Sequence, residues 1–169
     1  MRIILSMLIL ASISLGAQAT VPEHDQEPSG CVFDGEGFVW FVSVPDGWVL
    51  SCLAPEHSEV PIALWPTGSS WKTASVVMYV NPTPRSAPDR SVQSVITAEV
   101  ARFRRDNPTV TVTEAAAIET RSEGTAVVRH YTGDRWGSYE AVAFLDTEGP
   151  VAVVVLSTKR EPEFTKAYP

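Results

Sequence analysis

Two tryptophans and two serines lie close together in residues 65–72, where the sequence reads Trp-Pro-Thr-Gly-Ser-Ser-Trp-Lys. Ser69 and Lys72 have the S-x-x-K spacing with which a lysine activates a serine nucleophile in penicillin-recognising enzymes. That chemistry also requires S-D-N and K-T-G elements, and the sequence has neither; Lys72 begins a K-T-A segment, which lacks the glycine. A small serine hydrolase that uses Ser69 or Ser70 with Lys72 is therefore the least favoured interpretation of this segment.

The same segment has the composition of a recognition loop. Tryptophan is enriched at binding hot spots, and functional loops on rigid sheets carry small polar residues. The alternative is that both indole rings fill the core, because tryptophan is largely buried on average. The candidate partner-binding residues are Trp65, Thr67, Ser69, Ser70, Trp71 and Lys72.

The three histidines, His24, His57 and His130, show none of the spacings of a metalloenzyme motif. Pro-Glu-His occurs twice, ending at His24 and at His57, and the two copies could offer imidazole and carboxylate ligands to Zn²⁺ or Cu²⁺. We favour the alternative that both are solvated turns, because a metal site needs an ordered set of supporting hydrogen bonds. The sequence predicts no metal site and no cofactor.

His130 lies on a predicted strand, on the side opposite to Arg129 and Tyr131, and is expected to be a surface or half-buried histidine. A Ser-His-Asp set could be drawn from His130, Asp134 and a distant serine, but no G-x-S-x-G elbow supports it. Since no coherent catalytic set emerges, the sequence favours a protein that is not an enzyme.

Cys31 and Cys52 are the only cysteines, and both follow a segment with the features of an export signal. Residues 1–19 contain Arg2, an apolar run and an A-x-A end at residues 17–19, which predict a signal peptide and a periplasmic or secreted protein. The apolar run is too short for a retained membrane anchor. An even number of cysteines in an oxidising compartment favours a Cys31–Cys52 disulfide.

The excess of acidic over basic residues limits the kinds of macromolecule that the protein is expected to bind. The 169 residues include 13 Lys and Arg against 20 Asp and Glu, which gives a formal net charge of −7. Nucleic-acid-binding domains show the opposite balance, so nucleic acid is excluded and an anionic membrane surface is disfavoured. One basic cluster, Arg102, Arg104 and Arg105, ends a predicted helix, where cations interact favourably with the helix dipole.

Around these residues the sequence predicts one long helix within a series of strands. The helix begins after Asp89 or Ser91, carries apolar residues at helical spacing and ends before Asn107-Pro108. The apolar run at residues 150–156 predicts the most buried strand, and residues 161–168 predict a short closing helix. The expected strands are residues 38–44, 48–53, 60–65, 74–80, 109–118, 125–131, 138–146 and 151–157.

Residues 41–48 read Phe-Val-Ser-Val-Pro-Asp-Gly-Trp, in which Pro-Asp-Gly favours a tight turn between two strands. This segment is similar to the aromatic-x-x-Val/Tyr-Pro-x-Gly-Trp hairpin that opens PsbP-like domains, and the order of elements after it also resembles that family. The resemblance implies an α+β fold, an antiparallel β-sheet sandwiched by helices, with an N-terminal hairpin. The expected organisation is a signal peptide at residues 1–19, a flexible lead-in at residues 20–30 and a single domain at residues 31–169.

The resemblance implies little about activity, because better-known members of the family are non-catalytic accessory or binding proteins. Our first hypothesis is an exported, non-catalytic accessory protein that binds another protein or a cell-envelope component. The alternative is a periplasmic inhibitor or immunity-type protein, whose acidic surface caps a basic toxin or hydrolase. Both need only a shaped surface, so the sequence does not separate them.

Overall fold

The computed structural model of the chain describes residues 30–53, 60–85, 91–120 and 124–168. These residues form a mostly antiparallel α+β structure. Its strands are β1 Gly30–Gly35, β2 Phe38–Ser43, β3 Trp48–Ser51, β4 Ile62–Pro66, β5 Val76–Thr83, β6 Thr111–Glu114, β7 Ile118–Glu119, β8 Thr125–Thr132, β9 Tyr139–Leu145 and β10 Val151–Thr158. Its helices are α1 Val92–Asp106 and α2 Glu161–Ala167. The α+β class agrees with the prediction.

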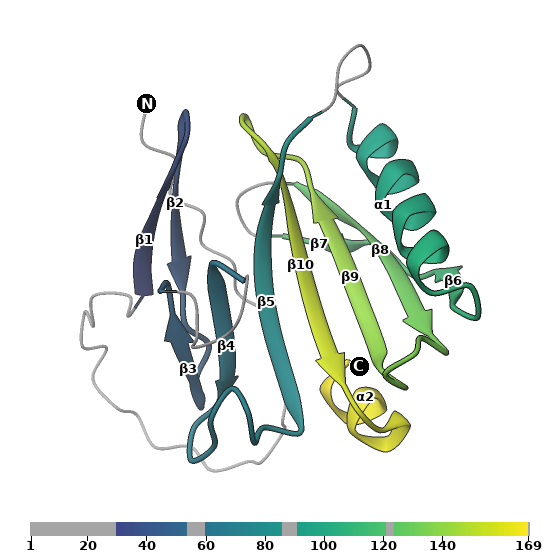
Figure 1. Cartoon of the computed structure of the whole chain (residues 1–169). Coiled ribbons are helices and arrows are strands. Elements are labelled where there is room, and N and C mark those ends of the chain that lie inside the picture. Colours follow the sequence, from purple (N-terminus) through teal and green to yellow (C-terminus); the bar gives the residue numbers. More distant parts are fainter. Residues whose placement is uncertain (1–29, 54–59, 86–90, 121–123, 169) are drawn as a thin grey trace.

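Most strands belong to one large antiparallel sheet with the order β3-β4-β5-β10-β9-β8-β6, in which β7 also pairs with β8 (Figure 1). β1 and β2 form a separate two-stranded sheet. Within the large sheet, β10 lies between β5 and β9 and joins the strands before α1 to the strands after it. Residues 151–155 of β10 are all buried, as the unbroken apolar run predicts.

Helix α1 forms where the sequence predicts it. Ser91 caps its first turn, since Ser91 Oγ accepts a hydrogen bond from Ser94 N at 3.1 Å. On its apolar stripe, the Phe103 ring meets Tyr131 of β8 edge-on, with the ring centroids 5.1 Å apart. The side of the large sheet beneath this helix is termed the α1 face, and its buried residues include Tyr131, Val142, Phe144, Val151, Val153 and Val155.

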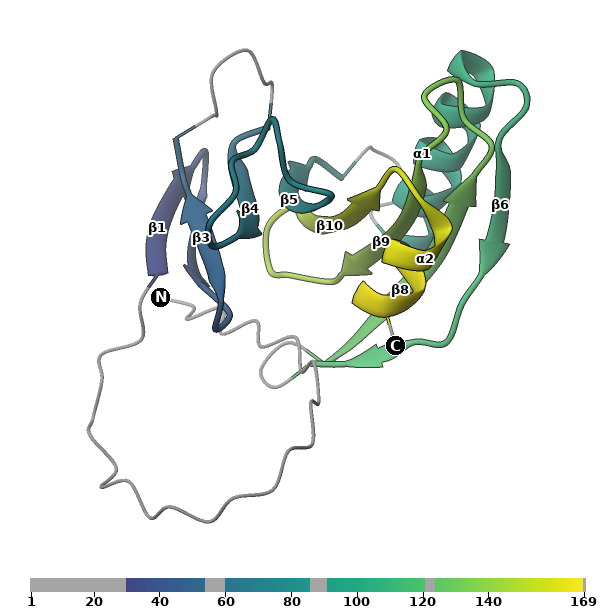
Figure 2. The ribbon, with the colours of Figure 1, turned by 90° about the horizontal axis from the view of Figure 1, so that it is seen from below.

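The opposite side of the large sheet is covered by the β1–β2 hairpin and by α2. Trp40 of β2 is only 3% exposed and packs with apolar side chains of β4, β5 and β10. Phe164 and Tyr168, in α2 and just after it, contact His130 of β8. The next residue, Tyr131, contacts Phe103 of α1, so the two helices lie against opposite sides of β8. Figure 2 shows α1 and α2 on opposite sides of the sheet.

The N-terminal hairpin differs from the prediction in its strands. The sequence predicts a hairpin across Pro45-Asp46-Gly47, whereas β2 pairs with β1 and β3 pairs with β4. The turn itself is present, because Trp48 N donates to Pro45 O at 3.1 Å and Gly47 has a φ of 77°. It passes the chain from the two-stranded sheet to the large sheet. β1 was not predicted because it has glycine at both ends and an aspartate within it, and these residues are depleted in strands.

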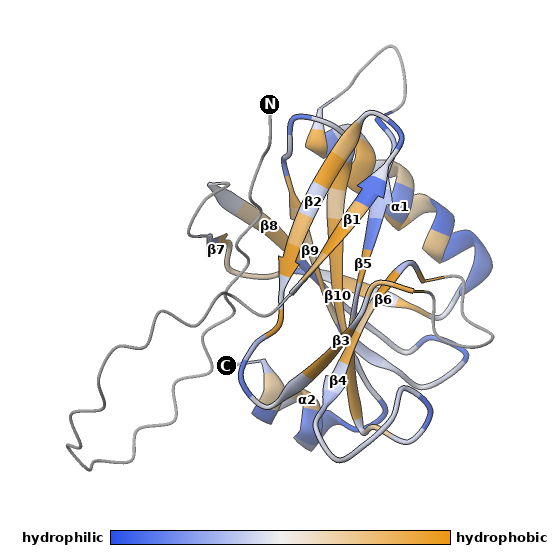
Figure 3. Cartoon of the chain, turned by 90° about the vertical axis from the view of Figure 1, so that its left-hand side faces the viewer, coloured by the Kyte–Doolittle hydropathy of each residue, from blue (hydrophilic) through white to orange (hydrophobic). Residues whose placement is uncertain are grey.

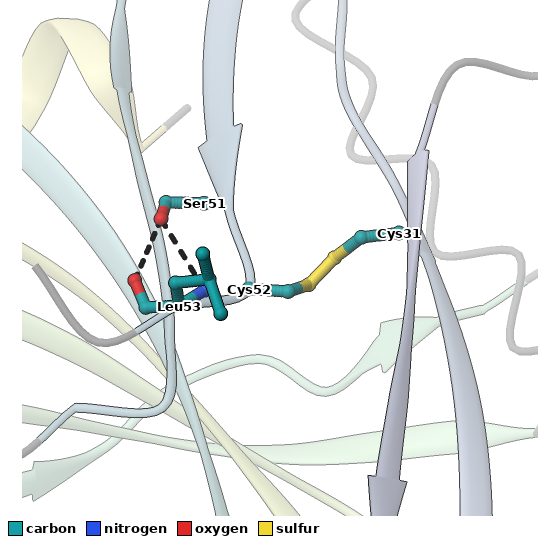
Figure 4. Close-up of a disulfide and its surroundings, with 4 residues drawn as sticks. All are labelled: Cys31, Ser51, Cys52 and Leu53. Carbon is teal, nitrogen blue, oxygen red and sulfur yellow. Dashed lines mark hydrogen bonds between the residues drawn. A yellow bond between two sulfur atoms is a disulfide. The ribbon is translucent and has the colours of Figure 1, made fainter.

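A disulfide joins Cys31 of β1 to Cys52, the residue after β3, as the sequence predicts (Figure 4). The two Cα atoms lie 6.3 Å apart, and the cysteines are separated by 21 positions in sequence. Beside the bridge, Ser51 Oγ donates to Leu53 O at 2.7 Å. Because β3 is an edge strand, the bridge ties the two-stranded sheet to one edge of the large sheet.

The strand predicted at residues 109–118 is divided in two in the structure. Residues 109–118 were expected to form one strand, but β6 and β7 are separated by Ala115, Ala116 and Ala117, and alanine has a low strand propensity. The predicted signal peptide, nearly all of the lead-in and the Asp89 cap lie outside the described residues.

The β1–β2 hairpin consists largely of hydrophobic residues (Figure 3), and some of them are exposed on its outer side. Val32 and Val39 are 63% and 44% exposed there, while the alternate residues of each strand face the core. This outer side is therefore a second candidate surface for binding a partner.

Candidate recognition site at the loop end of the sheet

The predicted recognition segment forms the connection between β4 and β5, and its serines are bonded within that connection. Ser69 Oγ donates to Pro66 O at 2.6 Å. The Ser70 hydroxyl lies 2.9 Å from Thr73 Oγ1, which also accepts from Ser70 N at 3.1 Å. Gly68 has a φ of 84°, a left-handed conformation that favours glycine. These bonds give the loop a defined shape and engage the hydroxyl groups that a serine hydrolase would use.

The two tryptophans of this segment are half-buried. Neither is a fully exposed binding residue or a fully buried core residue. Trp65 lies in β4, where it pairs with the edge strand β3. Trp71 meets the ring of Tyr79 edge-on, with the ring centroids 6.3 Å apart. Thr67 and Lys72 are exposed on the same loop. The loop thus gathers Thr67, Trp71 and Lys72, whereas Trp65 belongs to the sheet.

A third tryptophan, which the sequence analysis did not select, lies in the connection between β8 and β9. Trp136 is 54% exposed, and the guanidinium carbon of Arg135 lies 4.2 Å from its ring centroid. Asp134 Oδ1 accepts hydrogen bonds from Trp136 N at 3.1 Å and from Ser138 N at 2.7 Å. The sequence signal was an aspartate that can close a turn over its own backbone, directly before Arg-Trp-Gly.

Both connections lie at the same end of the large sheet. Val76 at the start of β5 pairs with Thr158 at the end of β10. Thr158 also pairs with Tyr139 at the start of β9, which pairs with Thr132 at the end of β8. The chain passes from β10 to α2 at this end as well (Figure 1). These connections, residues 67–75, 133–138 and 159–160, are termed the loop end.

A half-buried carboxyl group lies one step inside the loop end. Glu140 of β9 and Ser157 of β10 are cross-strand partners, and Ser157 Oγ donates to Glu140 Oε1 at 2.9 Å. Burial raises the pKa of Glu140, the Ser157 hydrogen bond opposes that rise, and the charges of Asp134 and Lys159 act in opposite directions. Lys159 Nζ donates to Ser138 Oγ at 3.2 Å. The carboxyl group therefore sits in a weakly hydrated environment with one strong hydrogen-bond donor.

Two aromatic residues, Tyr79 and Trp71, lie next to the Glu140–Ser157 pair. Val155 belongs to the α1 face, so Ser157 and its partner Glu140 lie on that face too. Tyr79 pairs with Val155 and is therefore the diagonal neighbour of Ser157. Burial raises the pKa of Tyr79, and the charge of Glu140 adds to the rise. Trp71, Tyr79, Glu140 and Ser157 are together termed the Glu140 cluster.

Sequence reasoning did not select Tyr79, Glu140 or Ser157, because all three lie inside strands that were predicted from their apolar residues. The available signal was Glu140 itself. Val142 and Phe144 lie on the same side of β9 as Glu140, and both are buried. An acidic residue that alternates with buried apolar residues is expected to be at least partly buried, which is unusual for glutamate.

His130 lies on the other side of the sheet, beneath α2. Its ring meets the rings of Phe164 and Tyr168 edge-on, with centroids 5.2 and 4.7 Å away. Its Nε2 atom is buried and has no hydrogen-bond partner within the described residues, and burial lowers its pKa. The half-buried position agrees with the expectation, and Asp134 is engaged by the backbone of its own turn.

The metal hypothesis concerned His24 and His57, and both lie outside the described residues. Within the described ranges, no group of three or more His, Cys, Asp or Glu side chains is placed to hold a metal ion. In those same ranges, no helix combines the length and apolar character needed to cross a membrane.

Comparison with known proteins assigns the chain to no family. No protein-family model matches the sequence, and no curated protein matches it.

Proposed function

We propose that this protein is an exported, non-catalytic protein that binds another protein or a cell-envelope component through the loop end. The observation that carries the proposal is Trp136, which is 54% exposed and yet held in place. Asp134 fixes its turn through two backbone hydrogen bonds, and Arg135 covers its ring. A large side chain that is already ordered loses little freedom on binding, and tryptophan and arginine are the commonest hot-spot residues.

The β4–β5 connection enlarges the same surface. Trp71 adds a half-buried ring, and Thr67 and Lys72 add exposed polar contacts. Ser69 and Ser70 contribute by shaping the loop through their hydrogen bonds, and Trp65 supports it from β4. The predicted partner-binding segment therefore remains part of the proposed site, and Trp136 is added to it.

The proposal places the protein in the periplasm or outside the cell. A Cys31–Cys52 bridge persists in an oxidising compartment, and a signal peptide at residues 1–19 would direct the chain there. We also propose that the arrangement is PsbP-like, with the antiparallel sheet between helices. Contacts of α1 and α2 with opposite sides of β8 support this, and the analogy favours a binding role.

Site-specific photo-crosslinking tests the binding function. A photo-reactive amino acid replaces Trp136 in one variant and Val39, on the outer side of the hairpin, in a second. Irradiation in an envelope extract should give one discrete adduct from position 136, and excess wild-type protein, but not Trp136→Ala protein, should suppress it. An adduct from position 39 alone would move the binding surface to the hairpin. No adduct at either position would contradict the proposal.

A second candidate is a periplasmic inhibitor or immunity-type protein, which the net charge of −7 favours. A basic toxin or hydrolase would associate rapidly with an acidic protein, and the association would weaken as salt rises. An adduct with a basic enzyme whose activity falls on binding would select this candidate. A serine hydrolase is disfavoured, because the Ser69 and Ser70 hydroxyl groups are hydrogen-bonded within their own loop.

A further inference from the structure

Glu140 is a half-buried acid whose only hydrogen-bond partner among the described residues is Ser157. The ion pairs of the described residues do not include Glu140. The nearby Lys159 ammonium instead bonds to Ser138, and Ser157 supplies the hydrogen bond to Glu140. Burying a carboxylate without a cation costs stability, and a neutral glutamine could accept the same serine bond. The packing of this strand therefore does not explain why the side chain is an acid.

The Ser157 hydrogen bond to Oε1 affects which cation the Glu140 carboxylate can bind best. Ser157 already uses one lone pair of Glu140 Oε1, whereas no hydrogen bond to Oε2 is found among the described residues. A guanidinium binds a carboxylate best through both oxygens at once, whereas an ammonium is a point charge that one oxygen can hold. The geometry thus favours an ammonium group over a guanidinium.

The neighbouring aromatic rings suit the same ligand. Tyr79 is the diagonal neighbour of Ser157, and Trp71 meets Tyr79 from the loop end. Aromatic faces attract ammonium groups, and the apolar stem of a lysine packs along such rings while its charged end reaches further in. The charge of Asp134 adds negative potential at Glu140, and the charge of Lys159 opposes it. Helix α1 packs on the same side of the sheet as Tyr79, since both belong to the α1 face.

We propose that the Glu140 cluster binds a primary ammonium group, supplied by a lysine side chain of the partner that docks on the loop end. This inference rests on the proposed binding function. The lysine would pass Trp71, lie against Tyr79 and donate a hydrogen bond to Glu140 Oε2. The partner is therefore a protein with an exposed lysine at its contact surface.

Titration with two matched probes tests the ligand chemistry. Nα-acetyl-lysine methylamide carries the ammonium group, and Nα-acetyl-norleucine methylamide has a similar stem without it. The indole N–H signal of Trp71 reports binding by NMR, and a Trp71→Phe spectrum assigns it. Two charge-matched variants are compared with wild type: Glu140→Gln, and Glu148→Gln in the β9–β10 turn at the opposite end of the sheet.

The lysine probe should shift the Trp71 signal saturably, and the norleucine probe should not. Glu140→Gln should weaken the lysine probe at least about tenfold, as expected for a lost hydrogen bond to a charged group. Glu148→Gln should change its affinity by no more than about twofold, because an exposed distant charge is screened. Equal binding of both probes, or unchanged binding by Glu140→Gln, would overturn the inference. Urea unfolding of each variant confirms that it is folded.

The two proposals fail in different ways. If position 136 still crosslinks to its partner and Glu140→Gln leaves that yield unchanged, the loop end binds a partner but the ammonium site is wrong. If no partner is captured while the lysine probe binds in a Glu140-dependent manner, the ammonium site is correct and the protein-binding function is wrong.

Discussion

Removing the Cys31–Cys52 bridge should lower the free energy of unfolding by about 3 kcal/mol, which follows from the length of chain that the bridge closes. The cysteines are 21 positions apart. In the chain-entropy relation, a loop of this size confers about 3 kcal/mol on the folded state, because it restricts the unfolded chain. Trp40 still packs the hairpin against the large sheet without the bridge, so Cys31→Ala/Cys52→Ala protein should fold.

Urea unfolding followed by tryptophan fluorescence measures this loss. With a slope of about 1.5 kcal/mol per molar urea, a loss of about 3 kcal/mol lowers the midpoint by about 2 M. The single variants Cys31→Ala and Cys52→Ala serve as controls, because either one opens the same loop. Hydrogen exchange should increase most in β1 and β2, which pair only with each other among the described strands.

An unfolding free energy of the double variant within about 0.5 kcal/mol of wild type would refute the reasoning, since surface changes alone reach that size. A large difference between the single and double variants would also refute it. Such a difference would show that a side chain at one cysteine position, rather than the closed loop, determines the stability.

Three further predictions concern the core and the titrating groups. Phe103→Ala should cost about 3 kcal/mol in urea unfolding, because its ring packs on Tyr131, whereas exposed Arg104→Ala should stay within about 0.5 kcal/mol. Burial lowers the pKa of His130 below 6.5, so the unfolded chain takes up the proton first and stability should fall as the pH drops from 7 to 5, less so in His130→Gln. Burial raises the pKa of Glu140 above 4.5, so the folded state favours the protonated acid and loses that advantage as the pH rises. Glu140→Gln should therefore unfold at higher urea than wild type at pH 7, and the gain should vanish at pH 4.

The elements that local patterns define were predictable from the sequence. Helix α1 has a capping serine at Ser91, apolar residues at helical spacing and a stop at Asn107-Pro108, and each signal acts within a few residues. Strand β10 is an unbroken apolar run. The pairing of β10 with β5 was not predictable, because alternation tells which side of a strand is buried and not which strand lies beside it.

The site was predictable only in part, for a related reason. Trp71 stood out because tryptophan is unusual in a polar loop, and Lys72 because of its S-x-x-K spacing from Ser69. Glu140 and Ser157 come from strands that are adjacent only in the folded sheet, so their hydrogen bond has no counterpart in sequence spacing. Trp136 was missed because a tryptophan beside a turn is equally compatible with a buried and an exposed ring.

The central position of β10 also sets the order in which the chain can fold. Until residues 151–158 have been synthesised, β5 and β9 have no common neighbour, and each presents an open edge. Such non-local pairing is slow, because distant segments have to be brought together before contacts stabilise them. If the chain is exported as proposed, the sheet would stay incomplete until β10 is available, which would keep the chain unfolded enough for translocation. A chain that ends before β10 would keep open strand edges and would tend to aggregate.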